Sequence, residues 1–205
     1  MKHHLLLASI LLALGTGAMA QTMPVTPVTP VTTATTVQRD VNQQTRIENG
    51  LKDGSLNTRE AGRLEKEQSQ IERLQAKELK DGTLSPKERA QLRMAQNKAS
   101  RDIQAAKTND VKGNPESKSS ERMQADVQRN VNQETRIEQG VQAGTLTNRE
   151  VGKLERGQAR VDRKEAAAAR DGHVGKHEQA VIQRKDNNKS EEIFDKKRNG
   201  KNRKG

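Results

Sequence analysis

The chain of 205 residues contains no cysteine, tryptophan or tyrosine, and Phe194 is its only aromatic residue. Without cysteine the protein can form no disulfide, thiol nucleophile, thiolate metal site or iron–sulfur cluster. A single aromatic side chain gives no platform on which successive bases could stack, and together with the export signal described next this predicts no nucleic-acid partner. The core must therefore be built from Leu, Ile, Val and Ala, and an apolar content of 30% predicts that it is thin.

Long apolar runs are also absent, apart from one near the start of the chain. Residues 1–20 combine Lys2, an apolar stretch over residues 5–14 and the triplet A-M-A at residues 18–20. This order is typical of a cleavable signal peptide, with cleavage after Ala20. A membrane-spanning helix would need about 20 apolar residues. We therefore expect a periplasmic or secreted protein with no transmembrane segment after cleavage.

Residues 21–36, QTMPVTPVTPVTTATT, carry proline at every third position from Pro24 to Pro30. This composition favours an extended, polyproline-like conformation that buries no core. We expect a disordered Thr/Pro-rich tether between the signal peptide and the first folded unit.

Positive charge is in excess, with 38 Lys and Arg against 27 Asp and Glu, a formal net charge of +11. Residues 195–205 are especially basic, and residues 200–205 form the tail end of the chain. A basic block attracts polyanions. In an exported protein this predicts an anionic cell-envelope component as partner, such as lipopolysaccharide phosphates, anionic lipid or an acidic cell-wall polymer. A protein partner and a purely solubilising tail are the alternatives, and the sequence leaves the oligomeric state open.

The sequence contains an internal duplication. Residues 37–109 align without a gap on residues 127–199, at an offset of 90. The first copy begins VQRDVNQQTRIENGLKDGSLNTRE and the second begins VQRNVNQETRIEQGVQAGTLTNRE. Such self-similarity predicts two repeats of one architecture. The Gly-, Pro- and Ser-containing stretch at 110–126 is typical of a flexible linker.

Each copy carries turns that are typical of helix–turn–helix corners. In the first corner Gly54 stands where a helix would end, and Asn57 stands three residues before Glu60, which is the spacing of a capping box. Apolar residues recur at helical spacing around the corners, and no stretch alternates as a strand would. We predict three helices per copy, at 37–52, 58–80 and 86–107 in the first and 90 residues later in the second.

The predicted fold class is therefore all-α. It consists of two tandem copies of a three-helix unit joined by a flexible linker, with a disordered N-terminal segment and a basic C-terminal tail. The last helix, at 176–197, is left open, because Lys185 and Lys189 stand where the first copy has Ala95 and Ala99.

The corners also match the frame of an EF-hand loop, which has Gly at position 6, an aliphatic residue at 8 and Glu at 12. Asp53, Asn57 and Glu60 fall at positions 5, 9 and 12 of the first loop, and Asp81 and Glu88 at positions 5 and 12 of the second. A leucine holds position 3 of both loops, whereas calcium needs six to eight oxygen ligands. The two alternatives are a plain helix–turn–helix connector and a weak calcium site.

A second candidate metal site is the pair His173 and His177, which lie four residues apart. Two imidazoles one helical turn apart can bind zinc or copper. Gly175 stands between them, so a helix would begin between the two rings. Solvated surface histidines are the alternative.

The run R-I-x-x-G-x-x-x-G-x-L-N/T-x-x-E-x-x-x-L-E-x-x-Q occurs at residues 46–68 and again at 136–158. On this run the chain resembles a group of small exported proteobacterial helical proteins with degenerate EF-hand-like helix–loop–helix repeats. The resemblance covers both copies. It implies an exported helical protein and no particular activity.

Motifs typical of catalysis are absent. The first copy has no histidine, the chain has no G-x-S-x-G or glycine-rich phosphate loop, and we expect Glu65 and Glu67 on solvated helix faces among Lys and Arg. We predict that the protein is not an enzyme but a non-catalytic exported interaction or structural protein that binds an anionic envelope surface. The alternative is a low-affinity divalent-cation buffer or sensor that acts through the loops.

Overall fold

The computed structural model describes residues 32–201, and these residues form six α-helices and no strand. The helices are α1 (Thr33–Lys52), α2 (Thr58–Glu78), α3 (Pro86–Thr108), α4 (Lys118–Gln142), α5 (Asn148–Ala168) and α6 (Lys176–Arg198). A short 3-10 turn, η1 (Ala169–Asp171), follows α5. The all-α class is thereby confirmed. The predicted signal peptide, most of the predicted tether and residues 202–205 lie outside the described residues.

Helices begin where a side-chain oxygen can satisfy a free backbone N–H of the first turn. At α2, the amide oxygen of Asn57 accepts from the N–H of Glu60 at 2.9 Å, while the Glu60 carboxylate accepts from the N–H of Asn57 at 3.1 Å. The helices before the two equivalent corners end two residues before Gly54 and Gly144, whose φ angles are 72° and 68°. Glycine adopts this left-handed conformation without a steric penalty.

Two helices begin earlier than the sequence predicts. The hydroxyl of Thr32 accepts from the N–H of Thr35 at 3.2 Å, so α1 includes the end of the predicted Thr/Pro tether. The hydroxyl of Ser117 accepts from the N–H of Ser120 at 3.1 Å, so α4 takes in residues 118–126 of the predicted linker. In both cases a hydroxyl residue that had been assigned to a flexible segment serves as the helix cap.

The rest of the linker packs against the first corner. The N–H of Gly113 donates to the carbonyl of Gly54 at 2.9 Å. A Cβ atom at position 113 would lie 2.3 Å from the carbonyl oxygen of Leu56, so only glycine fits this close approach. The expectation of a flexible linker therefore does not describe residues 110–117, which are held in place by the first copy.

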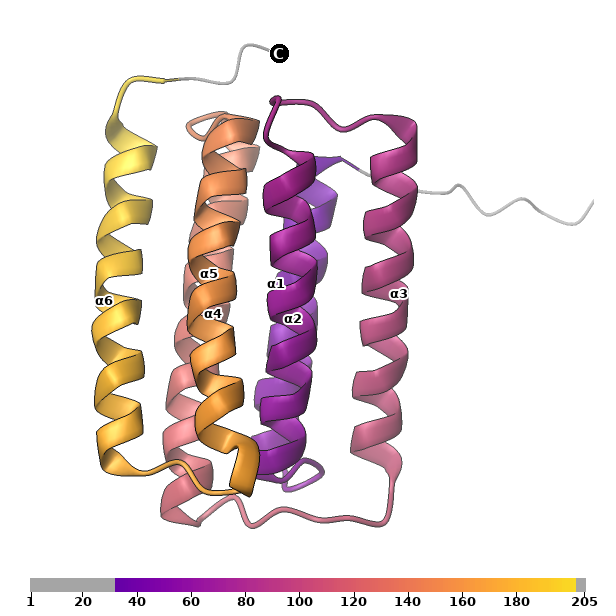
Figure 1. Ribbon diagram of the computed structural model, residues 1–205, viewed down its shortest axis with the longest axis vertical. Coiled ribbons are helices and arrows are strands. Elements are labelled where there is room, and N and C mark those ends of the chain that lie inside the picture. Colours follow the sequence, from indigo (N-terminus) through magenta and orange to yellow (C-terminus); the bar gives the residue numbers. More distant parts are fainter. Residues whose placement is uncertain (1–31, 202–205) are drawn as a thin grey trace, which may run out of the picture.

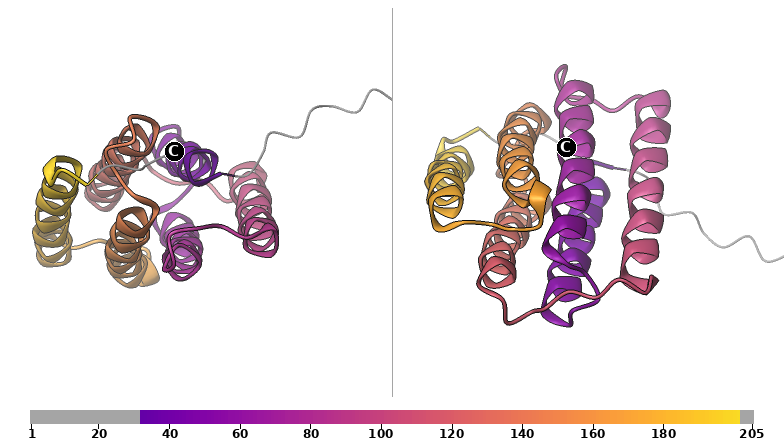
Figure 2. Two further views of the ribbon diagram at one scale, coloured as in Figure 1. Left: turned by 90° about the horizontal axis from the view of Figure 1, so that it is seen from above. Right: turned by 60° about the horizontal axis from the view of Figure 1, so that its bottom comes forward.

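The two copies do not form separate units. The most extensive helix packing joins α2 to α5 and α1 to α4, each across the duplication, and packing between α1 and α2 of one copy is much smaller. Figure 1 shows these four helices in the middle, with α3 and α6 at the two outer edges. The view from above in Figure 2 shows the same order. The prediction of two tandem modules thus gives way to one bundle with four inner helices.

Small residues allow α2 and α5 to approach closely. A Cβ atom at Gly62, near the start of α2, would lie 2.5 Å from the Cβ of Ala169, just after the end of α5. At the other end, a Cβ at Gly152 would lie 3.1 Å from the Cβ of Leu79 and 3.4 Å from the carbonyl oxygen of Ala76. The start of each helix therefore faces the end of the other, and the pair is antiparallel.

The bundle interior is layered along its length. Two clusters of buried aliphatic residues occupy its ends, one around Ile47, Leu64 and Val127 and the other around Val37, Leu154 and Ile137. Between them, every inner helix contributes buried polar residues. On α2, for example, the polar stretch runs from Glu65 to Gln75, about 15 Å of helix. The duplication thus gives a polar layer sealed at both ends by apolar packing.

None of the helices in the described part of the chain is long and apolar enough to cross a membrane.

Candidate metal centre

The polar layer is rich in carboxyl groups that are withdrawn from solvent. Eight carboxyl residues on the four inner helices are at most 1% exposed: Asp40, Glu65, Glu72, Asp126, Glu134, Glu155, Asp162 and Glu165. Those on α2 and α5 recur at a spacing of seven residues, Glu65 with Glu72 and Glu155 with Asp162, which places them on one helix face. This face is turned inward because α2 and α5 pack against each other. The expectation that Glu65 lies on a solvated face is therefore wrong.

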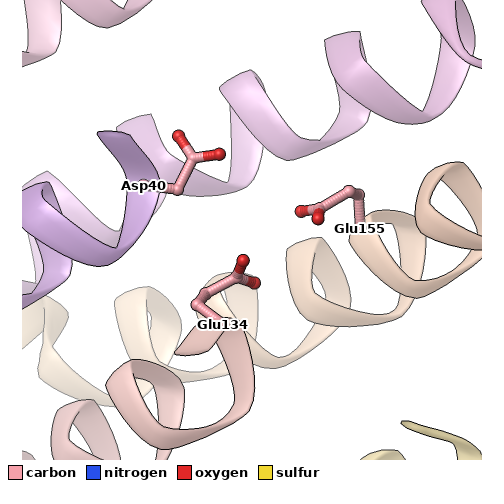
Figure 3. Close-up of side chains that lie close together, drawn as sticks. All are labelled: Asp40, Glu134 and Glu155. Atoms are coloured by element: carbon pink, nitrogen blue, oxygen red, sulfur yellow. The ribbon is translucent and has the colours of Figure 1, made fainter. Parts of the chain in front are cut away.

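The first carboxyl group of the layer comprises Asp40 of α1, Glu134 of α4 and Glu155 of α5. One oxygen from each residue lies within 4.8 Å of the other two. Figure 3 shows the three side chains converging on the same space between their helices. The Asp40 carboxylate also accepts from the side-chain amides of Gln75 and, at 2.8 Å, Gln96. These two amides fix its orientation.

Glu134 and Glu155 differ from Asp40 because their oxygens have no hydrogen-bond partner among the described residues. Both side chains are fully buried. Burying an ionised carboxylate without a partner is strongly unfavourable, so such groups are normally paired, protonated or bound to a metal. The charge of Lys189 acts on Glu134, but the Lys189 ammonium group donates its hydrogen bond to the backbone carbonyl of Leu154.

The second carboxyl group comprises Glu65 of α2 with Asp162 and Glu165 of α5, and one oxygen from each again lies within 4.8 Å of the others. Here each carboxylate has one oxygen held by an amide. The side-chain N–H of Gln44 lies 3.0 Å from Glu65 and 3.4 Å from Asp162, and that of Asn130 lies 2.8 Å from Glu165. The other oxygen of each carboxylate has no partner within the described chain.

A relay of amides orients the second group. The side-chain N–H of Gln158 donates to the Asn130 oxygen at 2.8 Å, which leaves the Asn130 N–H to donate to Glu165. Hydrogen bonds behind a ligand fix its geometry and tune its affinity in metal sites. The side-chain oxygen of Gln44, whose amide nitrogen contacts Glu65 and Asp162, is buried and has no hydrogen-bond partner among the described residues, so it is available as a neutral ligand.

Glu72 connects the two groups electrostatically. Burial raises its pKa well above the usual value, and the neighbouring charges of Asp162, Glu134 and Glu155 raise it further. Asp162 belongs to the second group and the two glutamates to the first. Charges in one group therefore raise the pKa of carboxyl groups in the other, so the two are not isolated sites.

Burial has the same effect throughout the layer. It raises the pKa of Asp40 to about 7 and the pKa of Glu65 to about 8. The pKa of Glu134 is raised to about 8, first by burial and then by the charge of Asp40. In the absence of a cation these carboxyl groups hold protons near neutral pH, and a cation must displace those protons.

One positive charge reaches the layer from outside the inner bundle. Lys189 of α6 is 3% exposed, and its ammonium group donates to the backbone carbonyl of Leu154. Burial lowers its pKa, and the carboxylates of Glu192, Glu155 and Glu134 partly offset that effect. The last helix, left open by the sequence, therefore forms as α6, and its Lys189 faces inward.

Lys189 also lies beside a route to the surface. A cavity of about 150 Å³ between α5 and α6 is lined by Lys189, Gly157, Arg160 and Glu192, among others. A Cβ at Gly157 would lie 2.5 Å from the Lys189 ammonium nitrogen, so glycine leaves the space that this side chain occupies. Lys189 therefore lines this cavity and is also close enough to Glu155 and Glu134 for their charges to act on its pKa.

The donor set of the layer consists of oxygen atoms alone, since neither carboxyl group includes histidine and the chain has no cysteine. Carboxylate and amide oxygens suit the hard cations calcium, magnesium and manganese. Two oxygens on one calcium ion lie at most about 5.2 Å apart, twice its longest usual bond, whereas magnesium allows about 4.2 Å. The oxygens of each group lie within 4.8 Å of one another, close enough for all three residues to reach one calcium ion.

The residues predicted from the EF-hand frame lie in the corners and bond locally. Glu60 caps α2 and also accepts from the side chain of Asn109 at 2.8 Å, while Asp53 accepts from the N–H of Ser55 at 2.9 Å. Asp81 binds the N–H of Thr83 at 2.9 Å. These are the bonds of a helix–turn–helix connector.

The remaining predicted ligands show the same local pattern. Glu88 accepts from the N–H of Ser85 at 2.6 Å, and Asn57 caps α2. His173 and His177 are exposed on either side of the start of α6. Neither carboxyl group of the layer includes any of the seven residues predicted from the sequence, so calcium binding in the corners and zinc or copper binding by the histidines stay predictions.

Sequence reasoning missed the interior carboxyl groups because glutamate next to lysine and arginine is normally solvated. The sequence nevertheless contains one indication that these acidic residues are buried. Glu65, Glu155 and Asp162 each directly follow an aliphatic residue that is buried, as does Glu72 after Ile71. An acid that accompanies the apolar stripe of a helix, turn after turn, lies at the edge of its buried face.

Comparison of the chain with protein-family models, with curated proteins and with solved structures gives no match, so the site rests on its own geometry.

Proposed function

We propose that this protein is a non-catalytic, exported, divalent-cation-binding protein, and that the cation lies in the polar layer between its two copies. One observation carries the proposal: the fully buried Glu134 and Glu155 lack hydrogen-bond partners among the described residues and lie with Asp40 within 4.8 Å. A shared cation would satisfy all three carboxylates at once. Export is supported only by the signal-like pattern of residues 1–20.

The four-helix geometry supports this function. Helix bundles commonly build metal sites from carboxylates that project inward from facing helices. Here apolar clusters close both ends of the layer. The side-chain amides of Gln75 and Asn130 fix the orientation of Asp40 in the first group and of Glu165 in the second. Because the carboxyl residues of both groups are at most 1% exposed, they are withdrawn from a substrate, which favours storage, sensing or structural use of the cation over catalysis.

The raised pKa values predict modest affinity at neutral pH, because the cation competes with protons. Lys189 lowers the affinity further by placing a positive charge beside Glu155. We therefore propose a buffer or sensor whose affinity lies in the micromolar to millimolar range, as in calcium sensors and extracellular calcium modules.

The test is calorimetric titration of the purified, chelator-treated protein with calcium, and separately with manganese. Glu134→Gln/Glu155→Gln should abolish binding at the first group, because both changes keep the shape and remove the charge. The corner variant Asp53→Asn/Glu60→Gln should leave cation binding unchanged. Glu121→Gln, which removes a carboxylate from the exposed side of α4, serves as the matched control. Unchanged binding by the interior variant, or loss of binding by the corner variant, would refute the proposal.

A further inference from the structure

The outward side of α2 and α5 carries charge of one sign. On α2 the exposed residues recur three and four apart and include Arg59, Arg63, Lys66 and Arg73. On α5 the equivalent positions are Arg149, Lys153, Arg156 and Arg163. We call these eight residues the basic face. They lie on the opposite side of the same helices that present Glu65, Glu72, Glu155 and Asp162 to the interior.

A groove between the two helices gathers part of this charge. It has a volume of about 560 Å³ and is lined by Arg59, Arg63, Lys66, Arg73, Arg163 and Arg170. Its remaining lining residues are small, Gly62, Ser69, Ala166 and Ala167, and none of the lining residues is acidic. Small residues between long basic side chains leave room for a group the size of a phosphate to approach several guanidinium groups together.

The arginines of the groove are oriented but not neutralised. The Nε–H groups of Arg73 and Arg163, equivalent residues of the two copies, each donate to the carbonyl four residues earlier at 3.2 Å. Arg59 donates to the carbonyl of Asp171 at 2.9 Å. Within residues 32–201, no salt bridge to a carboxylate includes any member of the basic face. Their remaining N–H donors are therefore available to an anion.

The shape of the face indicates what kind of anion it fits. Two antiparallel helices of 21 residues lie side by side, each about 30 Å long, so the charges spread over an elongated surface. A bilayer presents its phosphates in a plane and attracts basic residues at this spacing additively. Stacking on bases is not available, because the only aromatic residue is Phe194 on α6.

We propose that the basic face docks on the phosphate plane of an anionic phospholipid bilayer, with a lipid headgroup phosphate in the groove between α2 and α5. This inference is independent of cation binding in the interior. It places the membrane contact on the folded bundle rather than on the basic residues 195–205.

The test is sedimentation of the full chain with vesicles that contain about 30% phosphatidylglycerol in phosphatidylcholine, in a chelator. The triple variant Arg63→Gln/Lys66→Gln/Arg73→Gln should bind about a hundredfold more weakly, since each basic residue contributes about fivefold. The matched control removes the same charge from the exposed side of α3, as Lys87→Gln/Arg93→Gln/Arg101→Gln, and should bind within about threefold of the parent protein. Far-ultraviolet circular dichroism establishes that both variants remain helical.

Three outcomes would overturn the inference. The first is no binding to anionic vesicles at about 50 mM salt, where electrostatic attraction is strong. The second is equal loss of binding in the α2 and α3 variants, which would assign the effect to net charge alone. The third is displacement of the protein from vesicles by a short DNA duplex at equal phosphate concentration, which would identify a soluble polyanion as the better partner.

Discussion

Asn130 donates a hydrogen bond of 2.8 Å to Glu165, and the equivalent pair in the first copy makes the same bond with donor and acceptor exchanged. There Gln75 stands in place of Glu165 and donates to Asp40, which stands in place of Asn130. Each pair therefore keeps one carboxylate and one amide between its two helices. The carboxylate of the pair lies on α1 in the first copy and on α5 in the second, and in both copies it lies in the polar layer. Each carboxyl group therefore contains one carboxylate whose orientation is fixed by an amide.

The raised pKa values predict an unusual dependence of stability on pH. Asp40, Glu65 and Glu134 have pKa values of about 7, 8 and 8 in the folded protein, well above those of unfolded chains. Above about pH 4 the unfolded chain releases these protons while the folded protein keeps them. The folded state then binds more protons, so stability falls as the pH rises from about 5 to about 8.

Urea denaturation of the chelator-treated protein across that range measures this directly. The midpoint should move to lower urea concentration with each step up in pH. Exposed carboxylates contribute little here, because they are ionised in both states across the whole window. A midpoint that stays constant or rises between about pH 5 and about pH 8 would show that the interior groups are not protonated in the folded protein.

Lys189→Met should strengthen cation binding. The substitution removes a buried ammonium beside Glu155 and Glu134 and keeps an unbranched side chain of similar length. We expect calcium affinity to rise by at least about tenfold, or 1.4 kcal/mol. Arg184→Met, at an exposed position of the same helix, is the control. Weaker binding by the Lys189 variant would mean that the ammonium supports the site instead of competing with the cation.

Gly62→Ala should destabilise the bundle. Its new Cβ would lie 2.5 Å from that of Ala169, so α2 and α5 would have to separate. Overpacking of this kind costs about 1–3 kcal/mol. Gly175→Ala is a suitable control, because its Cβ would meet only the Glu178 carboxylate, at 3.4 Å. Thermal unfolding distinguishes the two, and equal melting temperatures would argue against the close pairing of the two copies.

Local features of the fold could be predicted from the sequence. Asn57 with Glu60, and Thr147 with Glu150, fix helix starts through contacts three residues apart, and Gly54 fixes a helix end through its own backbone. Such signals need no knowledge of distant residues. For this reason the helix class and most boundaries are confirmed.

The pairing of the copies depends on distant contacts that spacing does not reveal. The residues around Gly62 in the sequence do not indicate that it contacts Ala169. Until α2 is known to pair with α5, the sequence alone does not determine which side of α2 faces the interior. The same ambiguity hid the carboxyl groups: Glu65 is buried while Lys66, the next residue, is exposed. Which of the two faces the interior is decided only when the helices pack.

Proton release on calcium binding tests the central claim most directly. Calorimetric titrations at about pH 7 in two buffers of different ionisation enthalpy give the number of protons released per cation. Cation binding among the interior carboxyl groups predicts a net release, because their pKa values of about 7 to 8 leave protons to be displaced. Binding heats that are identical in the two buffers, or no binding at millimolar calcium, would contradict it.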